Sequence, residues 1–411
     1  MEIVQTAAKT VDARPNSSYT VAMTLLEELQ KYARAGILPL HMPGHKRGED
    51  LLGGALPYAL DITEVPGFDD LHDMRGVLLG TARLAAKLYG APRAFPLVNG
   101  TTGGILAAVR AVTRGKTGRL VLSRASHRSV WNAAELCGLT PEIITPDTDP
   151  AAGLFGSVTP EAFARALDAP NAVCAVITSP TYDGVVSDLR ALTQLAHSRG
   201  VPLIADAAHG AHFGFSPQFP QNAARLGADV EVVSLHKTLP ALTQCSLLLA
   251  GNDAYSRALE DQLRVFETSS PSYILLASID ACLRLLESRG AELFAAYARR
   301  LEAFGGALRL QKLTRVDRSP RFYGFDAGKI VVSTRGASID GPGLAQVLRG
   351  TYKIETETSG IAHVLAMTSI CDTEEGLLRF ADALNEIDAG LTASPAPPVL
   401  PAYPPGTVEL P

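Results

Sequence analysis

Short apolar runs alternate with helical stretches through the middle of the chain, from about residue 81 to residue 250. Each run has the length of a strand, and several are rich in valine and isoleucine. Strands that alternate with helices in this way are typical of a mainly parallel sheet covered by helices on both faces. We therefore predict an α/β domain, with strands at residues 95–98, 120–122, 172–178, 201–206, 229–234 and 247–250.

The pattern changes on either side of this region. Residues 19–35 predict an amphipathic helix that Gly36 stops, and residues 37–80 are rich in loop signals. The tail over 394–411 carries many prolines and is expected to be extended. A long helical stretch over 272–305 leads into a smaller domain, for which we predict strands at 329–334 and 362–369 and a helix at 374–389.

Residues that can do chemistry follow three of the predicted strands. Lys237 comes directly after one strand, Asp206 ends another, and a Gly-Thr-Thr turn precedes the helix at 105–112. Because parallel strands end at the same edge of an open α/β sheet, and ligands bind at that edge, we expect these groups to lie close together. The turn consists of Gly100, Thr101 and Thr102.

Together the three groups suit pyridoxal 5'-phosphate. A lysine crowded by hydroxyl and imidazole groups loses its proton near neutral pH, and Lys237 could then form a Schiff base with the aldehyde. Asp206 would pair with the protonated ring nitrogen, and the amides of a helix start bind phosphate. Each group alone also has a simpler interpretation: a surface lysine, a helix N-cap and a capped helix.

Six short segments carry a resemblance to a known family. In their order along the chain they resemble the ornithine/lysine/arginine decarboxylase family, and more closely its short bacterial form, over about residues 35–290. The resemblance implies the aspartate-aminotransferase-like fold, called fold type I. This fold has a mainly parallel seven-stranded sheet with helices on both faces and a smaller α+β C-terminal domain. The segments are His-Met-Pro-Gly-His-Lys at 41–46, Asp-Ile-Thr-Glu at 61–64, Asp-Asp-Leu-His at 69–72, Asn-Gly-Thr-Thr at 99–102, Asp-Ala-Ala-His-Gly-Ala-His at 206–212 and Ser-Leu-His-Lys-Thr-Leu-Pro-Ala-Leu-Thr-Gln at 234–244.

The resemblance also implies roles for individual residues. Lys237, Asp206 and His127 are the catalytic residues it implies, and His127 matches a histidine that stacks on the pyridine ring. Ala208 matches a small residue beneath the ring. Residues 268–273 match a segment that crosses to a neighbouring active site, which implies a homodimer or a higher homo-oligomer. The full set of implied cofactor-binding residues is Gly100, Thr101, Thr102, His127, Asp206, Ala208, His209, Ser234, His236 and Lys237.

The expected reaction is decarboxylation of a basic amino acid, with arginine favoured over lysine or ornithine, to carbon dioxide and a polyamine precursor. Acidic residues could hold the amine or guanidinium at the far end of the substrate, although a solvated acidic loop would look the same. An aminotransferase or aldolase of the same fold is an alternative, as is a catalytically silent regulatory relative, against which the intact Lys237 and Asp206 argue. The candidate substrate residues are Asp69, Asp70, Glu355 and Glu357, with Asp61 and Glu64 near the first pair.

The chain departs from the resemblance in two places. Position 207 is alanine where Asp-Glu-Ala-His is common, and the chain stops at Pro411 where relatives carry a further stretch, which implies an abbreviated small domain. We expect an N-terminal helix and loop segment over residues 1–70, a large cofactor-binding domain over 71–305 and a small domain over 306–411.

Composition agrees with a globular enzyme. The chain has 411 residues, of which 46% are hydrophobic and 19% charged, and its net charge of -5 argues against a nucleic-acid partner. Residues 1–18 lack a secretory pattern and no apolar run is long enough for a membrane span, so we expect a cytoplasmic protein without membrane contact. The five scattered cysteines suggest reduced core thiols, and we predict no metal site at the pairs His41/His45 and His209/His212.

Overall fold

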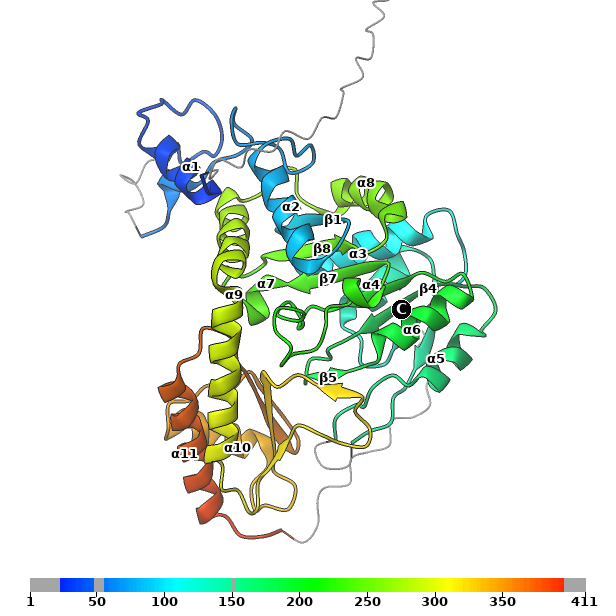
Figure 1. Cartoon of the computed structure of the whole chain (residues 1–411), viewed down its shortest axis with the longest axis vertical. Helices are drawn as coiled ribbons and strands as arrows, with labels where there is room; N and C mark the ends of the chain where they lie inside the picture. Colours follow the sequence, from blue (N-terminus) through cyan, green and yellow to red (C-terminus); the bar gives the residue numbers. More distant parts are fainter. Residues whose placement is uncertain (1–22, 48–54, 150–152, 395–411) are drawn as a thin grey trace, which may run out of the picture.

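A seven-stranded sheet forms the centre of the larger part of the molecule (Figure 1). The computed structural model describes residues 23–47, 55–149 and 153–394. The strand order is β1-β8-β7-β6-β4-β2-β3, and β8 runs antiparallel to both of its neighbours while the other strands are mutually parallel. The strands are β1 (Arg93–Leu97), β2 (Arg119–Ser123), β3 (Thr140–Ile144), β4 (Ala172–Thr178), β6 (Leu203–Asp206), β7 (Val230–Ser234) and β8 (Ser246–Ala250).

Helices cover both faces of this sheet because successive strand side chains point to opposite sides. In β2, Leu120 and Leu122 pack in one core cluster with α3, α4 and α8, whereas Val121 packs in another with α5 and α6. All three side chains are fully buried. The helices of these two layers are α3 (Gly100–Thr113), α4 (Arg128–Leu136), α8 (Ser256–Phe266), α5 (Pro160–Leu167) and α6 (Leu189–Ser198).

A second, four-stranded sheet of order β12-β13-β11-β9 forms the smaller part. The long helix α9 (Tyr273–Ala307) runs from the large sheet to this part and packs against α11 (Figure 1). A short antiparallel pair, β5 (Val185–Val186) with β10 (Gly324–Phe325), also connects the two parts. The small part contains β9 (Thr314–Val316), β11 (Lys329–Ser333), β12 (Thr358–Gly360), β13 (His363–Met367), α10 (Gly341–Gly350) and α11 (Glu374–Gly390).

The predicted α/β fold with a mainly parallel seven-stranded sheet is confirmed. The N-terminal helix is shorter than predicted, because Thr24 caps it: its side chain accepts from the backbone N–H of Glu27 at 3.2 Å, and the Glu27 carboxylate accepts from the Thr24 N–H at 2.8 Å. Residues 19–22 and the proline-rich tail from 395 lie outside the described residues. The remaining helical elements are α1 (Leu25–Ala33), η1 (Tyr58–Leu60), α2 (Val77–Tyr89), η2 (Ala224–Leu226), α7 (Leu235–Thr238) and η3 (Asp253–Tyr255).

The cysteines follow the expectation in part. Cys174, Cys245 and Cys282 are buried, and all five thiols are free. Cys371 is exposed, because it lies in the turn between β13 and α11 rather than in the core. In the described parts of the chain, no helix combines the length and the apolar character that a bilayer crossing requires.

Glu231 is a buried acid within β7, and its ionisation should affect stability. Burial raises its pKa from 4.5 to about 7, so the folded state resists ionisation that the unfolded state permits. The free energy of unfolding therefore has its full value with respect to Glu231 below about pH 4.5. It falls as the pH rises through 7, by up to about 3 kcal/mol. We expect Glu231→Gln to raise the denaturant midpoint at pH 8 more than at pH 5. An equal effect at both pH values would contradict this.

Candidate active site

Four strand ends of the large sheet supply the predicted site residues. The Gly100-Thr101-Thr102 segment that follows β1 is the first turn of α3, so the helix begins earlier than residue 105. His127 follows β2, Asp206 is the last residue of β6, and Lys237 lies in α7 directly after β7. These strands are mutually parallel, so their carboxyl ends meet at one edge, and contacts described below join the β1, β6 and β7 groups across it.

The start of α3 forms an open anion site. Its first residue, Gly100, has a φ of +71°, a left-handed conformation that favours glycine. The Asn99 side chain makes no capping hydrogen bond and donates instead to the Phe266 carbonyl at 3.1 Å. The Thr101 hydroxyl lies 3.0 Å from the buried Ser234 hydroxyl. First-turn amides with adjacent hydroxyls suit a phosphate group.

Asp206 is a buried carboxylate with weak hydrogen bonds. It is 2% exposed, and its oxygens accept from the Ala208 N–H at 3.3 Å and from the Thr178 hydroxyl at 3.5 Å. Burial raises its pKa, and the Ala208 N–H and the charge of Lys237 oppose this effect. A buried carboxylate with only long bonds gains from a charged N–H donor, as the pyridinium nitrogen of pyridoxal phosphate would be. The residues present therefore fit this cofactor.

The Lys237 amine lies beside an imidazole. Its Nζ is 3.1 Å from His209 Nε2. Burial lowers the pKa of Lys237, and the charges of Asp206 and Glu357 partly offset this effect. A partly desolvated amine loses its proton more readily and becomes a nucleophile, which is the property that carbonyl chemistry requires.

The ring of His127 is held at the start of α4. Its Nδ1 accepts from the Ser129 N–H at 3.2 Å, so this nitrogen carries no proton. The residue is exposed to solvent on the surface of the site. Desolvation nevertheless lowers its pKa, and the charge of Asp206 opposes the shift. A neutral, flat ring fixed by the backbone can stack on a planar cofactor.

Three further predicted residues line the same edge. The carbonyl of Ala208 accepts from the Ser234 N–H at 3.3 Å. His236 Nδ1 donates to the Cys245 carbonyl at 3.0 Å, and burial lowers the pKa of this ring. The Cys245 carbonyl therefore occupies the Nδ1 proton, which leaves the other nitrogen for a ligand.

Of the four candidate substrate carboxylates, Glu357 lies in the site. It accepts from the Tyr182 hydroxyl at 2.7 Å, and its charge acts on Lys237. Glu355 points elsewhere: it is exposed and pairs with Arg349 at 2.9 Å.

The other two carboxylates have local structural contacts. Asp69 accepts three backbone N–H groups at the start of α2, from Arg75 at 2.8 Å, Gly76 at 2.7 Å and Leu78 at 3.2 Å. Asp70 accepts the His72 N–H at 2.7 Å. These bonds order the loop before α2, and a contact of Asp69 or Asp70 with the substrate stays a prediction.

Two residues that the sequence did not single out also belong to the site. Lys329 is 1% exposed at the start of β11, and its Nζ lies 2.7 Å from His209 Nδ1. The Tyr182 ring packs edge-on against His209, with centroids 5.1 Å apart. A charged residue at the head of an otherwise apolar strand was the available signal for Lys329.

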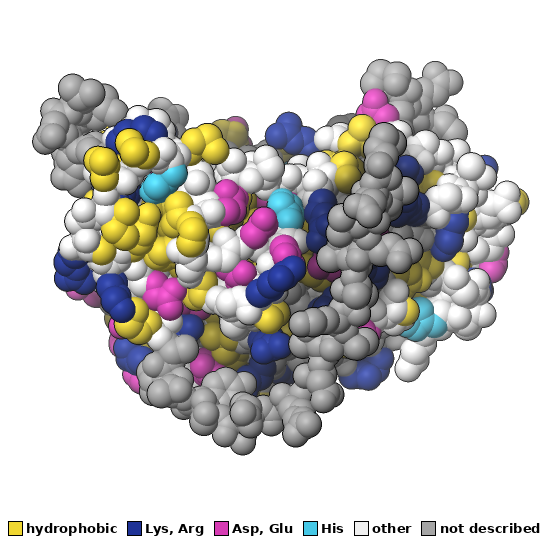
Figure 2. All heavy atoms as spheres, turned by 90° about the horizontal axis from the view of Figure 1, so that it is seen from above, with side chains coloured by type: hydrophobic (Ala, Val, Ile, Leu, Met, Phe, Trp, Pro, Cys, Tyr) yellow, Lys and Arg dark blue, Asp and Glu magenta, His cyan; other side chains and the backbone are white. Residues whose placement is uncertain are grey.

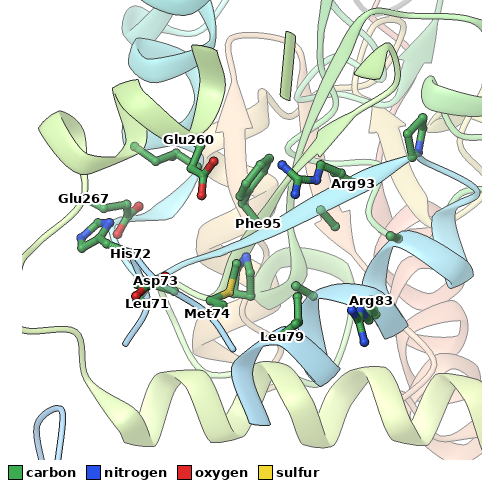
Figure 3. A pocket seen from close by; sticks show the side chains of 16 residues that line it. Leu71, His72, Asp73, Met74, Leu79, Arg83, Arg93, Phe95, Glu260 and Glu267 are labelled. Carbon is green, nitrogen blue, oxygen red and sulfur yellow. The ribbon is translucent and has the colours of Figure 1, made fainter. Parts of the chain in front are cut away.

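A separate cavity of about 330 Å³ lies beside the edge strand β1 (Figure 3). Glu260 and Glu267 enter it from the α8 side, opposite Met74 and Leu79. Glu267 accepts from the Asn99 N–H at 3.4 Å, and burial raises its pKa to about 7. None of the predicted cofactor residues lines this cavity, so it is separate from the candidate active site.

The segment 268–273 connects α8 to α9, and its last residue, Tyr273, is the first residue of α9. The Thr268 carbonyl accepts from His72 Nε2 at 2.9 Å, and its hydroxyl accepts from the Ser270 N–H at 3.1 Å. Ser269 and Ser270 are exposed. The segment is thus anchored at one end and open at the other, and its predicted contact with a neighbouring site stays a prediction.

A mainly parallel seven-stranded sheet with a lysine and a buried aspartate at its carboxyl edge is the arrangement of fold type I enzymes. Solved structures share this fold. Constitutive lysine decarboxylase of E. coli has a TM-score of 0.76 at 20% identity, over 89% of this chain and 60% of that one. Alanine–glyoxylate aminotransferase of Nostoc sp. has a TM-score of 0.61 at 14% identity, over 77% of this chain and 88% of that one.

The chain belongs to the Orn/Lys/Arg decarboxylase family, whose major-domain model matches residues 24–318. Members of this family are pyridoxal-phosphate-dependent lyases. The arginine decarboxylase of Halalkalibacterium halodurans is 32% identical over 371 residues, which cover 87% of this chain and 75% of the relative. The chain spans about 60% of the length of the lysine decarboxylase structure.

Proposed function

We propose that the chain is a pyridoxal-phosphate-dependent decarboxylase of a basic amino acid, with arginine as the first candidate substrate. The observation that carries this proposal is the meeting of Lys237, the buried Asp206 and the anion site of α3 at one sheet edge, in a chain of this family. The name of the H. halodurans relative favours arginine over lysine and ornithine.

Pyridoxal phosphate, when bound, supplies an electron sink for the charge left on Cα after loss of carbon dioxide. The chain's own groups would hold and orient the cofactor. The α3 amides with Thr101 and Ser234 would bind the phosphate, and His127 would cover the ring. Asp206 would keep the ring nitrogen protonated, and its burial would make this charge pair strong because little water screens it.

Glu357 and Tyr182 are the proposed contacts for the cationic end of the substrate. The carboxylate already accepts one hydrogen bond from the tyrosine and keeps free lone pairs for a guanidinium or ammonium group. We expect Glu357→Gln to raise KM for the basic substrate about tenfold while kcat changes little, since a charged hydrogen bond contributes about 1.5–3 kcal/mol.

The matched control for this variant is Glu355→Gln. Glu355 lies two residues away, exposed and paired with Arg349, so its neutralisation should leave KM unchanged. Steady-state kinetics on arginine, lysine and ornithine would measure both variants. Equal KM for Glu357→Gln and the unmodified chain would remove Glu357 from substrate binding.

Carbon dioxide release from carboxyl-labelled amino acids tests the proposed reaction. The purified chain with added pyridoxal phosphate should release label from arginine, lysine or ornithine and not from leucine or glutamate. The matching amine should form in equal amount. Release of a keto acid in the presence of pyruvate, without carbon dioxide, would support an aminotransferase instead.

We also propose that the enzyme is a cytoplasmic homodimer. Figure 2 shows hydrophobic side chains gathered on one side of the face seen from above. Three apolar side chains of the N-terminal segment, close together in the sequence, are exposed: Leu38 at 74%, Leu40 at 84% and Met42 at 63%. Exposed apolar side chains that lie close together in this way are typical of a protein interface. Analytical ultracentrifugation of the full chain tests the dimer.

A further inference from the structure

His209 lies between two lysine amines. Lys237 Nζ is 3.1 Å from one ring nitrogen, Nε2, and Lys329 Nζ is 2.7 Å from the other, Nδ1. His209 is 6% exposed and Lys329 is 1% exposed, so little water can take the place of either contact. The two lysines come from different sheets, one after β7 and one at the start of β11.

The hydrogen-bonding capacity of the His209 ring limits how many protons the two lysine amines can carry. A neutral imidazole carries one N–H donor and one lone pair, and an ammonium group can only donate. If both amines were protonated, one of them would face the ring N–H with no acceptor. Burial and the two neighbouring lysines keep the pKa of His209 low, so the ring itself stays neutral. Both contacts are therefore satisfied when one amine is charged and the other is neutral.

Either amine can carry the shared proton, because carboxylates act on both of them. Three carboxylates act on its amine, Asp326 from the loop before β11, Glu357 before β12 and Asp183 after β4, and the Tyr182 ring centroid lies 5.8 Å away. Two carboxylates act on Lys237, namely Asp206 and Glu357. Burial lowers the pKa of Lys329 to about 8, so this amine exchanges its proton near neutral pH. The titratable groups that act on His209 besides the two lysines are His127 and His236.

The position of Lys329 is fixed from both sides. The Asp326 carboxylate accepts from His212 Nε2 at 3.0 Å and from the Gly328 N–H at 2.9 Å, and its carbonyl accepts from the Lys329 N–H at 3.0 Å. Gly184, at a φ of +105°, packs so closely that a Cβ there would lie 2.7 Å from the Lys329 stem. The amine is thus directed at the histidine.

We propose that Lys237, His209 and Lys329 form a relay that shares one proton, with Lys329 holding it while Lys237 is a neutral amine. In the transfer, the Lys237 ammonium gives a proton to Nε2 as Nδ1–H gives one to Lys329. The total charge of +1 is unchanged, and the ring passes from one neutral tautomer to the other. Lys329 is a positioning residue in this sense, since it acts on Lys237 through the ring. The inference rests on the proposed role of Lys237 as the reactive amine.

Competitive labelling of the cofactor-free full chain with acetic anhydride tests the relay. Peptide mapping by mass spectrometry gives the pH at which each lysine becomes reactive. In Lys329→Met the second proton site is lost, and we expect the midpoint for Lys237 to move up by about one pH unit or more, because an adjacent positive charge no longer opposes protonation. Lys329→Arg keeps the charge without releasing a proton, so Lys237 should stay as reactive as in the unmodified chain or more so.

Lys353→Met is the matched control. This amine is exposed and donates to the Gly350 carbonyl within its own turn, so its loss should leave the Lys237 midpoint unchanged. An unmoved midpoint in folded Lys329→Met, or equal shifts in the Met and Arg variants, would overturn the relay. Where the Arg variant does not fold, the comparison of Lys329→Met with Lys353→Met decides.

A second measurement uses the holoenzyme. The pH at which the absorbance of the bound cofactor changes should rise in Lys329→Met and stay in Lys353→Met. Labelling needs no substrate. If the Lys237 midpoint shifts as expected but the protein releases no carbon dioxide, the relay would be supported and the proposed reaction would be contradicted. Carbon dioxide release with an unmoved Lys237 midpoint would support the reaction and contradict the relay.

Discussion

Lys237→Ala should bind pyridoxal phosphate without a covalent bond and lose activity by about 10³-fold or more, equivalent to about 4 kcal/mol. The reason is that the Lys237 amine faces the site beside His209 and is partly desolvated, as carbonyl capture requires. Borohydride treatment followed by peptide mapping should place the reduced cofactor on Lys237 in the unmodified chain. In the Ala variant no peptide should carry it.

The control for this variant is Lys353→Ala, which removes an exposed amine from the small part of the molecule. It should keep both the label and the activity. Reduced cofactor on a different lysine of the unmodified chain would contradict the assignment of Lys237. Label on Lys329 in particular would exchange the roles that we give to the two amines.

Asp206→Asn should keep the cofactor and lose activity by about 10²- to 10³-fold, about 3–4 kcal/mol, because an amide cannot hold the ring nitrogen protonated. Glu231→Gln is its matched control, since Glu231 is a fully buried carboxylate on the adjacent strand β7. Its carboxylate accepts from the Ala224 N–H at 2.8 Å. That variant should keep normal turnover. Normal turnover in Asp206→Asn as well would remove Asp206 from its proposed role.

The strand ends could be predicted from sequence because their signals are local. An apolar run followed at once by Asp206 or Lys237 fixes both the strand and the place of the polar group, and parallel topology then brings the ends together. The bounds of β4 followed from the same pattern, and β11 ends one residue earlier than predicted. The tight start of α1 depends on the side chain of one threonine, Thr24, which the periodicity does not report.

Lys329 could not be predicted in the same way. Its sequence context is that of a strand start, and its contact with His209 joins residues 120 positions apart. That contact depends on how the second sheet packs on the first, which no local pattern encodes. Asp69 shows the reverse case. Its acidic motif suggested a substrate contact, whereas three backbone N–H groups within nine residues occupy its carboxylate.

The short antiparallel pair of β5 and β10 fixes the position of the small sheet relative to the large sheet near the site. Gly184 and Asp326, which are joined by a 2.8 Å backbone hydrogen bond beside this pair, hold the stem of Lys329 on one side and its backbone on the other. A shift of the small sheet by an ångström would therefore lengthen the contact with His209 and uncouple the two amines. Under the proposed relay, the pKa of Lys237 would therefore depend on the spacing between the two sheets.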